Sequence, residues 1–166
     1  MTDALTVTRW GARYRGRRLP CAIGRGGLTR SKREGDGATP IGTHLILGLM
    51  FRPDRIAAST LPGWARPIGP SDLWSDDPAD PAYNHLVRAP HPYSHESLRR
   101  PDPLYDLVFV TDWNHPRATP GRGSAIFVHR WRKPRHPTAG CVAFAPQDLL
   151  WLARSLSPGT PLVVRD

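Results

Sequence analysis

The apolar runs of this chain have the length of β-strands, and this limits the folds open to it. The longest, "THLILGLMF" at residues 43–51 and "LYDLVFV" at residues 104–110, fall well short of the roughly 18 residues that a membrane-spanning helix requires. No membrane span is therefore expected. The 166 residues are enough to bury a core without disulfides or metals, so we expect a single domain over residues 1–166.

Short strands separated by turns are expected along most of the chain, at residues 4–10, 12–24, 43–52, 104–113, 123–131 and 160–166. One segment, "APQDLLWLARSLSPG" at residues 145–159, has the pattern of a helix. Its leucines at 149, 150, 152 and 156 share a face, and Pro158-Gly159 ends it. The expected fold class is mostly β, a β-rich mixed α/β domain with one main C-terminal helix.

A long insertion is expected between the strands. Residues 53–103 are dense in proline, aspartate, histidine and arginine. A stretch of that length without regular structure is usually a lid or a binding loop in a compact domain. A short helix is expected within it, around residues 94–99.

The net charge of the chain would suit a nucleic-acid binder, but the distribution of its arginines disfavours one. The net charge is +9, and 21 arginines stand against two lysines. These arginines are spread along the chain without a basic tail, a phosphate-binding GKS/T loop, a zinc-finger spacing or an aromatic RNA-binding strand. A basic surface suits an anionic polymer such as a cell wall equally well. No nucleic acid is expected as a partner.

The first residues, "MTDALTVTRWGARYRGRRLP", carry charges where a signal peptide has its apolar middle. No signal peptide is visible, and the sequence leaves the compartment and the export route open.

The segment "HRWRKPRHPTAGCVAF", residues 129–144, carries the features of a nucleophile site. His129 ends an apolar strand, and Cys141 begins another, so the imidazole can accept the thiol proton and lower the pKa of the thiol. Gly140 lets two backbone N–H groups, its own and that of Cys141, converge on a developing oxyanion. The alternative is that Cys141 is a small buried apolar residue. His136 is a rival base, but no strand holds it, and His129 is preferred.

Three motifs then resemble the L,D-transpeptidase (YkuD-like) catalytic domain family. They are the histidine, loop and [S/T]-x-G-C of residues 129–144, the segment "EGDGATPIGTHLI" at residues 34–46, and the stretches that lie between them, in the order of the family. The stretches "LWSDDPADPAYNHLV", "SHESLRRPDPLYDLVFVTDWN" and "GRGSAIFVHR" look like a bacterial branch with a short His-to-Cys loop and an Asp-rich insertion. The resemblance runs from about Gly24 to the C-terminus.

This resemblance implies a β-sandwich or barrel and a peptidoglycan enzyme without cofactor or metal. Cys141 would form a thioester with a donor stem peptide and pass it to the diaminopimelate amine of an acceptor stem, giving 3–3 or 1–3 crosslinks. His129 would be the base, the Arg130 backbone carbonyl would orient it, and the N–H groups of Gly140 and Cys141 would form the oxyanion hole. The family further implies carbapenem-type inhibitors and a place in the periplasm or cell envelope.

Two positions depart from the family pattern. Arg130 replaces the usual glycine after the histidine, and Ala143 replaces the usual arginine two residues after the cysteine. The clamp for the substrate carboxylate must therefore come from elsewhere. The candidates are Arg88, Arg130, Arg132 and Arg135.

The insertion offers further candidate substrate-binding residues. Acidic side chains at Asp76, Asp77 and Asp80 would hold the ammonium group of diaminopimelate, or else would form ordinary turns. Other side chains expected to line the cleft are Tyr83, Asn84, His95, Glu96 and Thr138. Loop-shaping roles are expected for Asp36, Thr39 and Pro40. A metal site at His85, His91 and His95 is disfavoured, because the spacing lacks the helix that such ligand pairs need.

Two other functions remain open at this point. With water as the acceptor, the same site would make a cysteine L,D-carboxypeptidase or a hydrolase of crosslinks. The second alternative is a basic module that binds cell wall or nucleic acid without catalysis, in which Cys141 would have no role.

Overall fold

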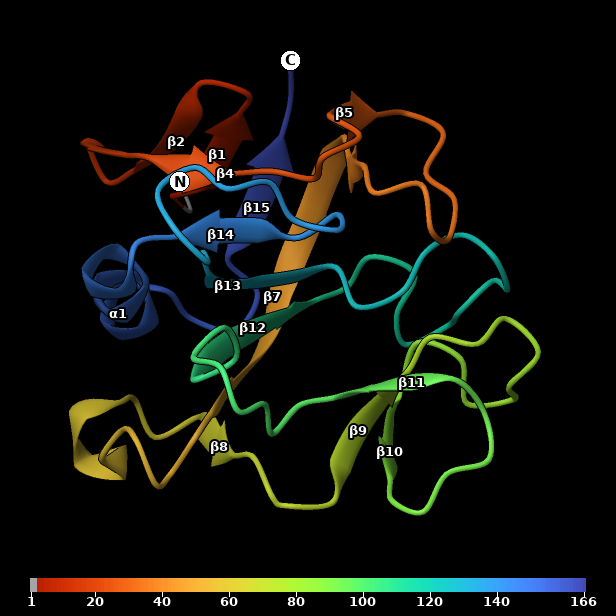
Figure 1. Ribbon diagram of the computed structural model, residues 1–166. Coiled ribbons are helices and arrows are strands. Elements are labelled where there is room, and N and C mark those ends of the chain that lie inside the picture. The colour runs from red at the N-terminus through yellow and green to blue at the C-terminus, as the bar shows by residue number, and fades with distance from the viewer. Residues whose placement is uncertain (1–2) are drawn as a thin grey trace.

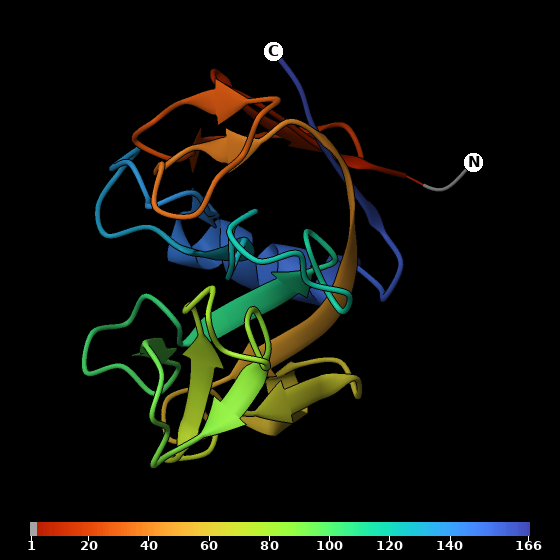
Figure 2. The ribbon, with the colours of Figure 1, turned by 90° about the vertical axis from the view of Figure 1, so that its right-hand side faces the viewer.

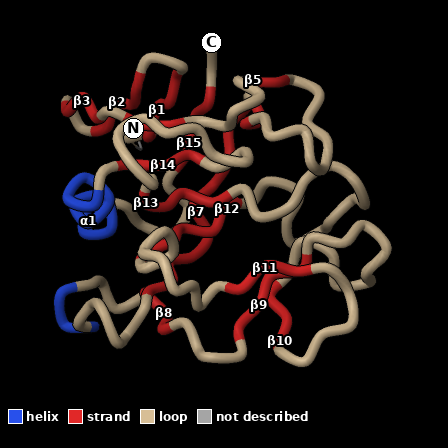
Figure 3. The backbone as a smooth tube through the Cα atoms, viewed as in Figure 1, coloured by secondary structure: helices blue, strands red, loops and turns tan. Residues whose placement is uncertain are grey.

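The computed structural model describes residues 3–166 and is mostly β, as the sequence predicts (Figures 1 and 3). The strands are β1 Leu5–Thr8, β2 Gly11–Tyr14, β3 Arg17–Leu19, β4 Cys21–Ala22, β5 Leu28–Thr29, β6 Thr39–Pro40, β7 Gly42–Phe51, β8 Ala65–Pro67, β9 Asp72–Ser75, β10 Leu86–Arg88, β11 His95–Ser97, β12 Leu107–Thr111, β13 Phe127–Arg130, β14 Val142–Phe144 and β15 Pro161–Val164. Helical turns in these residues are the 3-10 helix η1, Ala58–Thr60, and the α-helix α1, Pro146–Ser155.

Most strands join one ten-stranded sheet in the order β3-β2-β1-β15-β7-β12-β13-β14-β4, with β8 paired to β7. The two ends of this path, β3 and β4, are separated in the chain only by Pro20, so the sheet curls until it nearly closes. Figure 2 shows the curvature, with β7 bending along one side of the molecule. The barrel-like fold expected from the sequence is confirmed.

Strand β7 shows how the sequence sets the curvature. Its buried residues alternate at His44 and Ile46 and then again at Leu49 and Phe51, so the alternation shifts by one residue at Gly48. The pairing with β12 changes register at the same place, between Val110 and Thr111. A bulge of this kind bends a strand, and a glycine without a side chain accommodates it.

Helix α1 covers one side of the sheet and completes the core. It begins at Pro146, a favourable first residue, and carries Asp148 in its first turn and Arg154 in its last, as the helix dipole prefers. Leu149 and Leu152 are buried, and they pack with the side chains of β1, β7, β13 and β15. The sequence prediction of this helix is confirmed, although Leu150 is only half-buried.

The insertion is more ordered than its composition predicts. A three-stranded sheet, β10-β9-β11, lies within it, and residues 95–97 form strand β11. The expected short helix around residues 94–99 is therefore wrong. Glu96 pairs with Trp74 of β9 across the strands, and a segment with Leu98 as its lone apolar residue has no face with which a helix could pack.

Two arginines that follow β7 hold the end of the insertion. The Arg52 guanidinium donates to the Arg100 carbonyl, and Arg55 donates to the carbonyls of Pro101 and Asp102. These contacts place β11 and the following turn beside the start of β12. No helix in residues 3–166 is both long and apolar enough to cross a membrane.

Candidate active site

His129 lies on strand β13, and Cys141 lies just before the neighbouring parallel strand, β14. Strand β13 pairs with β14 so that His129 is opposite Ala143, and Cys141 immediately precedes β14. The Phe127 N–H lies 3.4 Å from Cys141 Sγ, and His129 follows Phe127 by two residues on the same face of β13. Both side chains therefore face the same side of the sheet.

They line one cleft of about 390 Å³. Its walls come from the loop before β6, the insertion, the start of β12 and the His-to-Cys loop. The lining residues include Arg25, Glu34, Asp76, Glu96, Arg100, Tyr105, Ala125, His129, Arg132, His136, Thr138 and Cys141.

His129 is held as a neutral base. Its Nδ1 donates to the Arg130 carbonyl oxygen at 2.7 Å, which leaves Nε2 with its lone pair free to accept a proton. The Tyr105 ring packs edge-on against the imidazole, with 5.3 Å between ring centroids. Burial lowers the pKa of His129 to about 4, so the imidazole is uncharged near neutral pH.

Cys141 is a protonated thiol in the resting protein. Its Sγ–H donates to the Ala125 carbonyl oxygen at 3.1 Å. Burial raises the pKa of Cys141 to about 12, and the charge of Glu96 adds to this rise, whereas the Phe127 N–H and Lys32 oppose it. The expectation that the neighbouring imidazole lowers the pKa of this thiol is wrong for the resting state, because the cost of burying a thiolate dominates.

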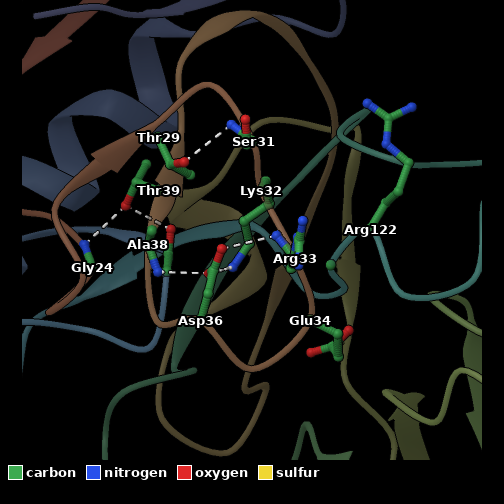
Figure 4. A network of polar contacts seen from close by, with 12 residues as sticks. Gly24, Thr29, Ser31, Lys32, Arg33, Glu34, Asp36, Ala38, Thr39 and Arg122 are labelled. Carbon is green, nitrogen blue, oxygen red and sulfur yellow. Dashed lines mark hydrogen bonds and ion pairs between the residues drawn. The ribbon is translucent and has the colours of Figure 1, made fainter.

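The peptide between Gly140 and Cys141 is fixed by hydrogen bonds. Thr39 Oγ1 donates to the Gly140 carbonyl at 2.8 Å. The same oxygen accepts from the Gly24 N–H at 2.8 Å (Figure 4). The Cys141 N–H therefore points away from Thr39, on the other edge of the same peptide. The Gly140 N–H, by contrast, donates to Thr138 Oγ1 at 3.1 Å.

The sequence matches the family model of the YkuD L,D-transpeptidase catalytic domain over residues 4–164. The chain belongs to this family. The family resemblance seen in the sequence is confirmed.

Two solved structures are similar to this YkuD domain. An L,D-transpeptidase from Mycobacterium smegmatis is 14% identical, with a TM-score of 0.47 and coverage of 99% of this chain and 59% of that one. L,D-transpeptidase 1 from Mycobacterium tuberculosis is 16% identical, with a TM-score of 0.42 and coverage of 98% and 62%. The domain thus spans less than two thirds of either chain. No curated protein matches the sequence significantly.

The YkuD domain places four of the expected binding residues in the cleft: Asp76, Glu96, Arg132 and Thr138. Thr138 Oγ1 donates to the Cys141 carbonyl at 2.6 Å, so this side chain also shapes the turn that leads to Cys141. The alternative base His136 also lines the cleft, and its backbone N–H donates to the Lys133 carbonyl.

Five expected binding residues lie outside the cleft: Asp77, Tyr83, Asn84, Arg88 and His95. Asp77 accepts from the backbone at Ala79 and Ser94. His95 Nδ1 donates to a backbone carbonyl in its own turn, and Arg88 is exposed on β10 beside Asp72.

Two of these five, Tyr83 and Asn84, are buried and form hydrogen bonds with the loops that border the cleft. Tyr83 O–H donates to Glu34 and accepts from the Gly123 N–H. Asn84 Oδ1 accepts from Trp74 Nε1 and from the Ala125 N–H, and this second contact helps to position Ala125, whose carbonyl accepts the hydrogen bond from the Cys141 thiol. Their polar character is visible in the sequence, but their direction is not.

The arginines considered as the carboxylate clamp lie in different parts of the domain. Ala143 is fully buried within β14, which leaves no space for the usual arginine. Arg130 borders a different cavity, beside Arg55 and α1, and Arg135 donates to the Trp10 carbonyl. Arg132 lines the cleft and forms no ion pair within residues 3–166.

Sequence reasoning missed several cleft residues. Arg25, Glu34, Arg100 and Tyr105 line it, and Arg100 is held in place by Asp102 at 2.8 Å. Tyr105 O–H donates to Glu96 at 2.9 Å, and burial raises the pKa of Glu96 to about 7. The sequence offered no signal for these four beyond their residue types.

The three histidines considered as a metal site, His85, His91 and His95, have different hydrogen-bond partners. His91 Nε2 contacts Asp80 at 2.6 Å, and His85 Nδ1 contacts the Tyr83 carbonyl. Asp80, considered as an ammonium ligand, is buried and accepts from Ser75 and Ala82. Within residues 3–166 no three histidine, cysteine or acidic side chains are arranged to hold a metal ion.

The buried neutral His129 makes the stability of the domain depend on pH. Its pKa is about 4 when folded and 6.5 in the unfolded chain, so the unfolded state binds an extra proton between these values. The free energy of unfolding should therefore fall by up to about 3 kcal/mol from this group as the pH drops from 6.5 to 4. Urea titrations of wild type and His129→Gln across this range measure the difference, and parallel curves for the two proteins would contradict it.

Proposed function

We propose that this domain is a peptidoglycan L,D-transpeptidase in which Cys141 is the nucleophile and His129 the base. The observation that carries the proposal is the shared cleft of a thiol and a neutral imidazole whose tautomer is set by the Arg130 carbonyl, in a chain of the YkuD family.

The first half of the reaction forms a thioester. As the donor stem carbonyl reaches Cys141, Sγ attacks its carbon, and the thiol proton passes to His129 Nε2. The carbonyl oxygen becomes an oxyanion that accepts from the Cys141 N–H, which Thr39 keeps aimed away from itself. The C–N bond then breaks, His129 returns the proton to the departing amine, and the terminal residue leaves.

The second half transfers the acyl group. The amine of an acceptor stem, most simply the side-chain amine of diaminopimelate, attacks the thioester carbon. His129 takes a proton from this amine, the C–S bond breaks, and the proton returns to the sulfur. Both halves use a neutral imidazole as the base, and the low pKa of His129 keeps this imidazole neutral below pH 6.5.

The Gly140 N–H has a different place in this proposal from the one the sequence suggests. It is engaged by Thr138 Oγ1, so it joins the oxyanion hole only by sharing its hydrogen or exchanging this partner. The Cys141 N–H is accordingly the principal donor.

The charges of the cleft fit a stem peptide. Carboxylates at Glu34, Asp76 and Glu96 suit the ammonium group of diaminopimelate, and Arg25 and Arg132 suit the carboxylates of the stem. Arg132 is thus the proposed clamp in place of the missing arginine at position 143. A peptidoglycan substrate sets the site of action in the cell envelope.

The test is incubation of the purified domain with defined tetrapeptide and tripeptide muropeptides in ¹⁸O-water, followed by mass spectrometry. Transfer gives crosslinked dimers, and fragmentation shows whether the donor carbonyl came from stem position three or one. Shortened monomers carrying ¹⁸O, without dimers, would replace the transferase with the hydrolase. Unchanged muropeptides, together with no acyl-protein adduct by intact mass, would overturn the proposal.

A further inference from the structure

Lys32 is a buried lysine whose side chain lies beside Gly140, the residue before the proposed nucleophile Cys141. It lies in the loop between β5 and β6, and its side chain is only 3% exposed. Its stem passes Gly123, where an added Cβ would lie 2.9 Å from Lys32 Cε, and its ammonium reaches Gly140, where an added Cβ would lie 3.4 Å from Nζ. Two glycines thus make the space for this side chain.

Asp36 fixes the position of this ammonium. Asp36 Oδ1 accepts from Lys32 Nζ at 2.5 Å and from the Ala38 N–H at 2.9 Å, and Oδ2 accepts from the Arg33 N–H at 2.8 Å (Figure 4). The carboxylate is anchored to the backbone on both oxygens. The charge of Lys32 is therefore preorganised rather than mobile.

The loop between β5 and β6 has backbone contacts to Asp36 as well as the Lys32 ion pair. In the turn of this loop, the Asp36 carboxylate accepts hydrogen bonds from two backbone N–H groups. The side chain of Asp36 remains 28% exposed to water. Elsewhere the chain also pairs arginine with aspartate at the surface, as in Arg9–Asp166, where both side chains are exposed. Burying an ammonium is costly unless its charge is used or fully paired, and Lys32 has one hydrogen-bond partner, Asp36, among residues 3–166.

We propose that Lys32 is a positioning residue for the thioester chemistry. Its ammonium, held by Asp36 behind Gly140, stabilises negative charge on the Cys141 sulfur and on the oxyanion at the Cys141 N–H. This role rests on the proposed function and adds to it a charge that acts through the Gly140–Cys141 peptide, without contact with substrate.

The surroundings of both groups are consistent with this role. Lys32 faces Asp36 and the Trp113 indole, and Cys141 is faced by Glu96, Tyr105 and neutral His129. Burial and Glu96 raise the pKa of Cys141, and Lys32 is the cation that opposes them. In a low-dielectric site a fixed charge of this kind acts more strongly than in water.

The experiment measures the rate at which iodoacetamide alkylates Cys141, by peptide mass, at about pH 8, where only the small thiolate fraction reacts. Lys32→Met keeps the length of the side chain and removes the charge. We expect alkylation to slow by about tenfold, which corresponds to about one pKa unit. Cys21, buried in the core, reports in the same protein on any general unfolding.

Asp36→Asn is the matched control, because it breaks the same ion pair but leaves the ammonium in place. We expect alkylation of Cys141 in this variant to be unchanged or faster. A purely structural role of the pair would instead loosen the loop in both variants and speed alkylation in both. If Lys32→Met does not fold, slower alkylation in Asp36→Asn overturns the inference.

The two proposals fail separately. Equal or faster alkylation of Lys32→Met, while wild type crosslinks muropeptides, overturns the role of Lys32 alone. Wild type that neither crosslinks nor acylates overturns the proposed function, whatever the alkylation rates are.

Discussion

Replacement of Cys141 by alanine is expected to abolish crosslinking, with a loss on the order of 10⁴-fold or more, because the group that forms the covalent intermediate is gone. The fold should persist, since the side chain contributes little to the core beyond its packing on Phe127 and Tyr105. Serine at the same position should also be nearly inactive. Its hydroxyl is a much weaker nucleophile, and His129 alone activates it poorly.

The measurement combines muropeptide transfer with intact-protein mass after exposure to a carbapenem. Wild type should gain one adduct, located at Cys141 by peptide mapping, and both variants at this position should gain none. Cys21→Ala is the matched control, because Cys21 is also a buried free thiol but packs in the core away from the cleft. Transfer that survives in Cys141→Ala, or is lost in Cys21→Ala, would contradict the assignment of the nucleophile.

The two thiols differ in access more than in acidity. Burial raises the pKa of Cys21 to about 11 and that of Cys141 to about 12. The sequence predicts an activated thiolate at Cys141. The structure instead has a neutral thiol that donates a hydrogen bond to the Ala125 carbonyl. In the proposed mechanism, deprotonation of the thiol is therefore coupled to its attack on the substrate. This could not be seen in the sequence, because it depends on how deeply the residue lies below the surface.

The local patterns of the sequence predicted the frame of the site well. The apolar run of strand length at residues 43–51 predicted β7, and the leucine spacing predicted α1. The ends of two other apolar runs predicted that His129 and Cys141 lie at strand ends, and the structure has His129 on β13 and Cys141 just before the neighbouring β14. These features depend on neighbours within a few residues, which the chain order records directly.

The parts that were missed depend on distant contacts. Strand β11 exists because it pairs with β9, some twenty residues away, and nothing within residues 94–99 encodes that pairing. Tyr83 and Asn84 point inward because Glu34, Gly123 and Ala125 meet them there. A signal was available for Lys32, since it is one of two lysines in a chain that otherwise uses arginine.

Replacement of Gly140 by alanine is expected to destabilise the domain by roughly 2–4 kcal/mol and to lower transfer by at least about 100-fold. Gly140 has a φ of 139°, which side chains rarely adopt, and an added Cβ would lie 2.9 Å from the Ala38 carbonyl oxygen. Relief of this clash has to move either the loop held by Asp36 or the peptide held by Thr39. Either movement shifts the Cys141 N–H and Sγ from the positions that the reaction needs.

Gly159→Ala provides the control for backbone strain alone. Gly159 also has a positive φ, 88°, but an added Cβ meets no atom within 4 Å, and the residue follows α1 away from the cleft. It should cost about 1 kcal/mol and leave transfer unchanged. Urea unfolding and muropeptide transfer, measured on both variants, separate the two effects. If the two alanines cost the same stability, or if Gly140→Ala transfers at the wild-type rate, then close packing behind the nucleophile does not position it, and the contacts of Thr39 and Lys32 with this loop lose their proposed part in catalysis.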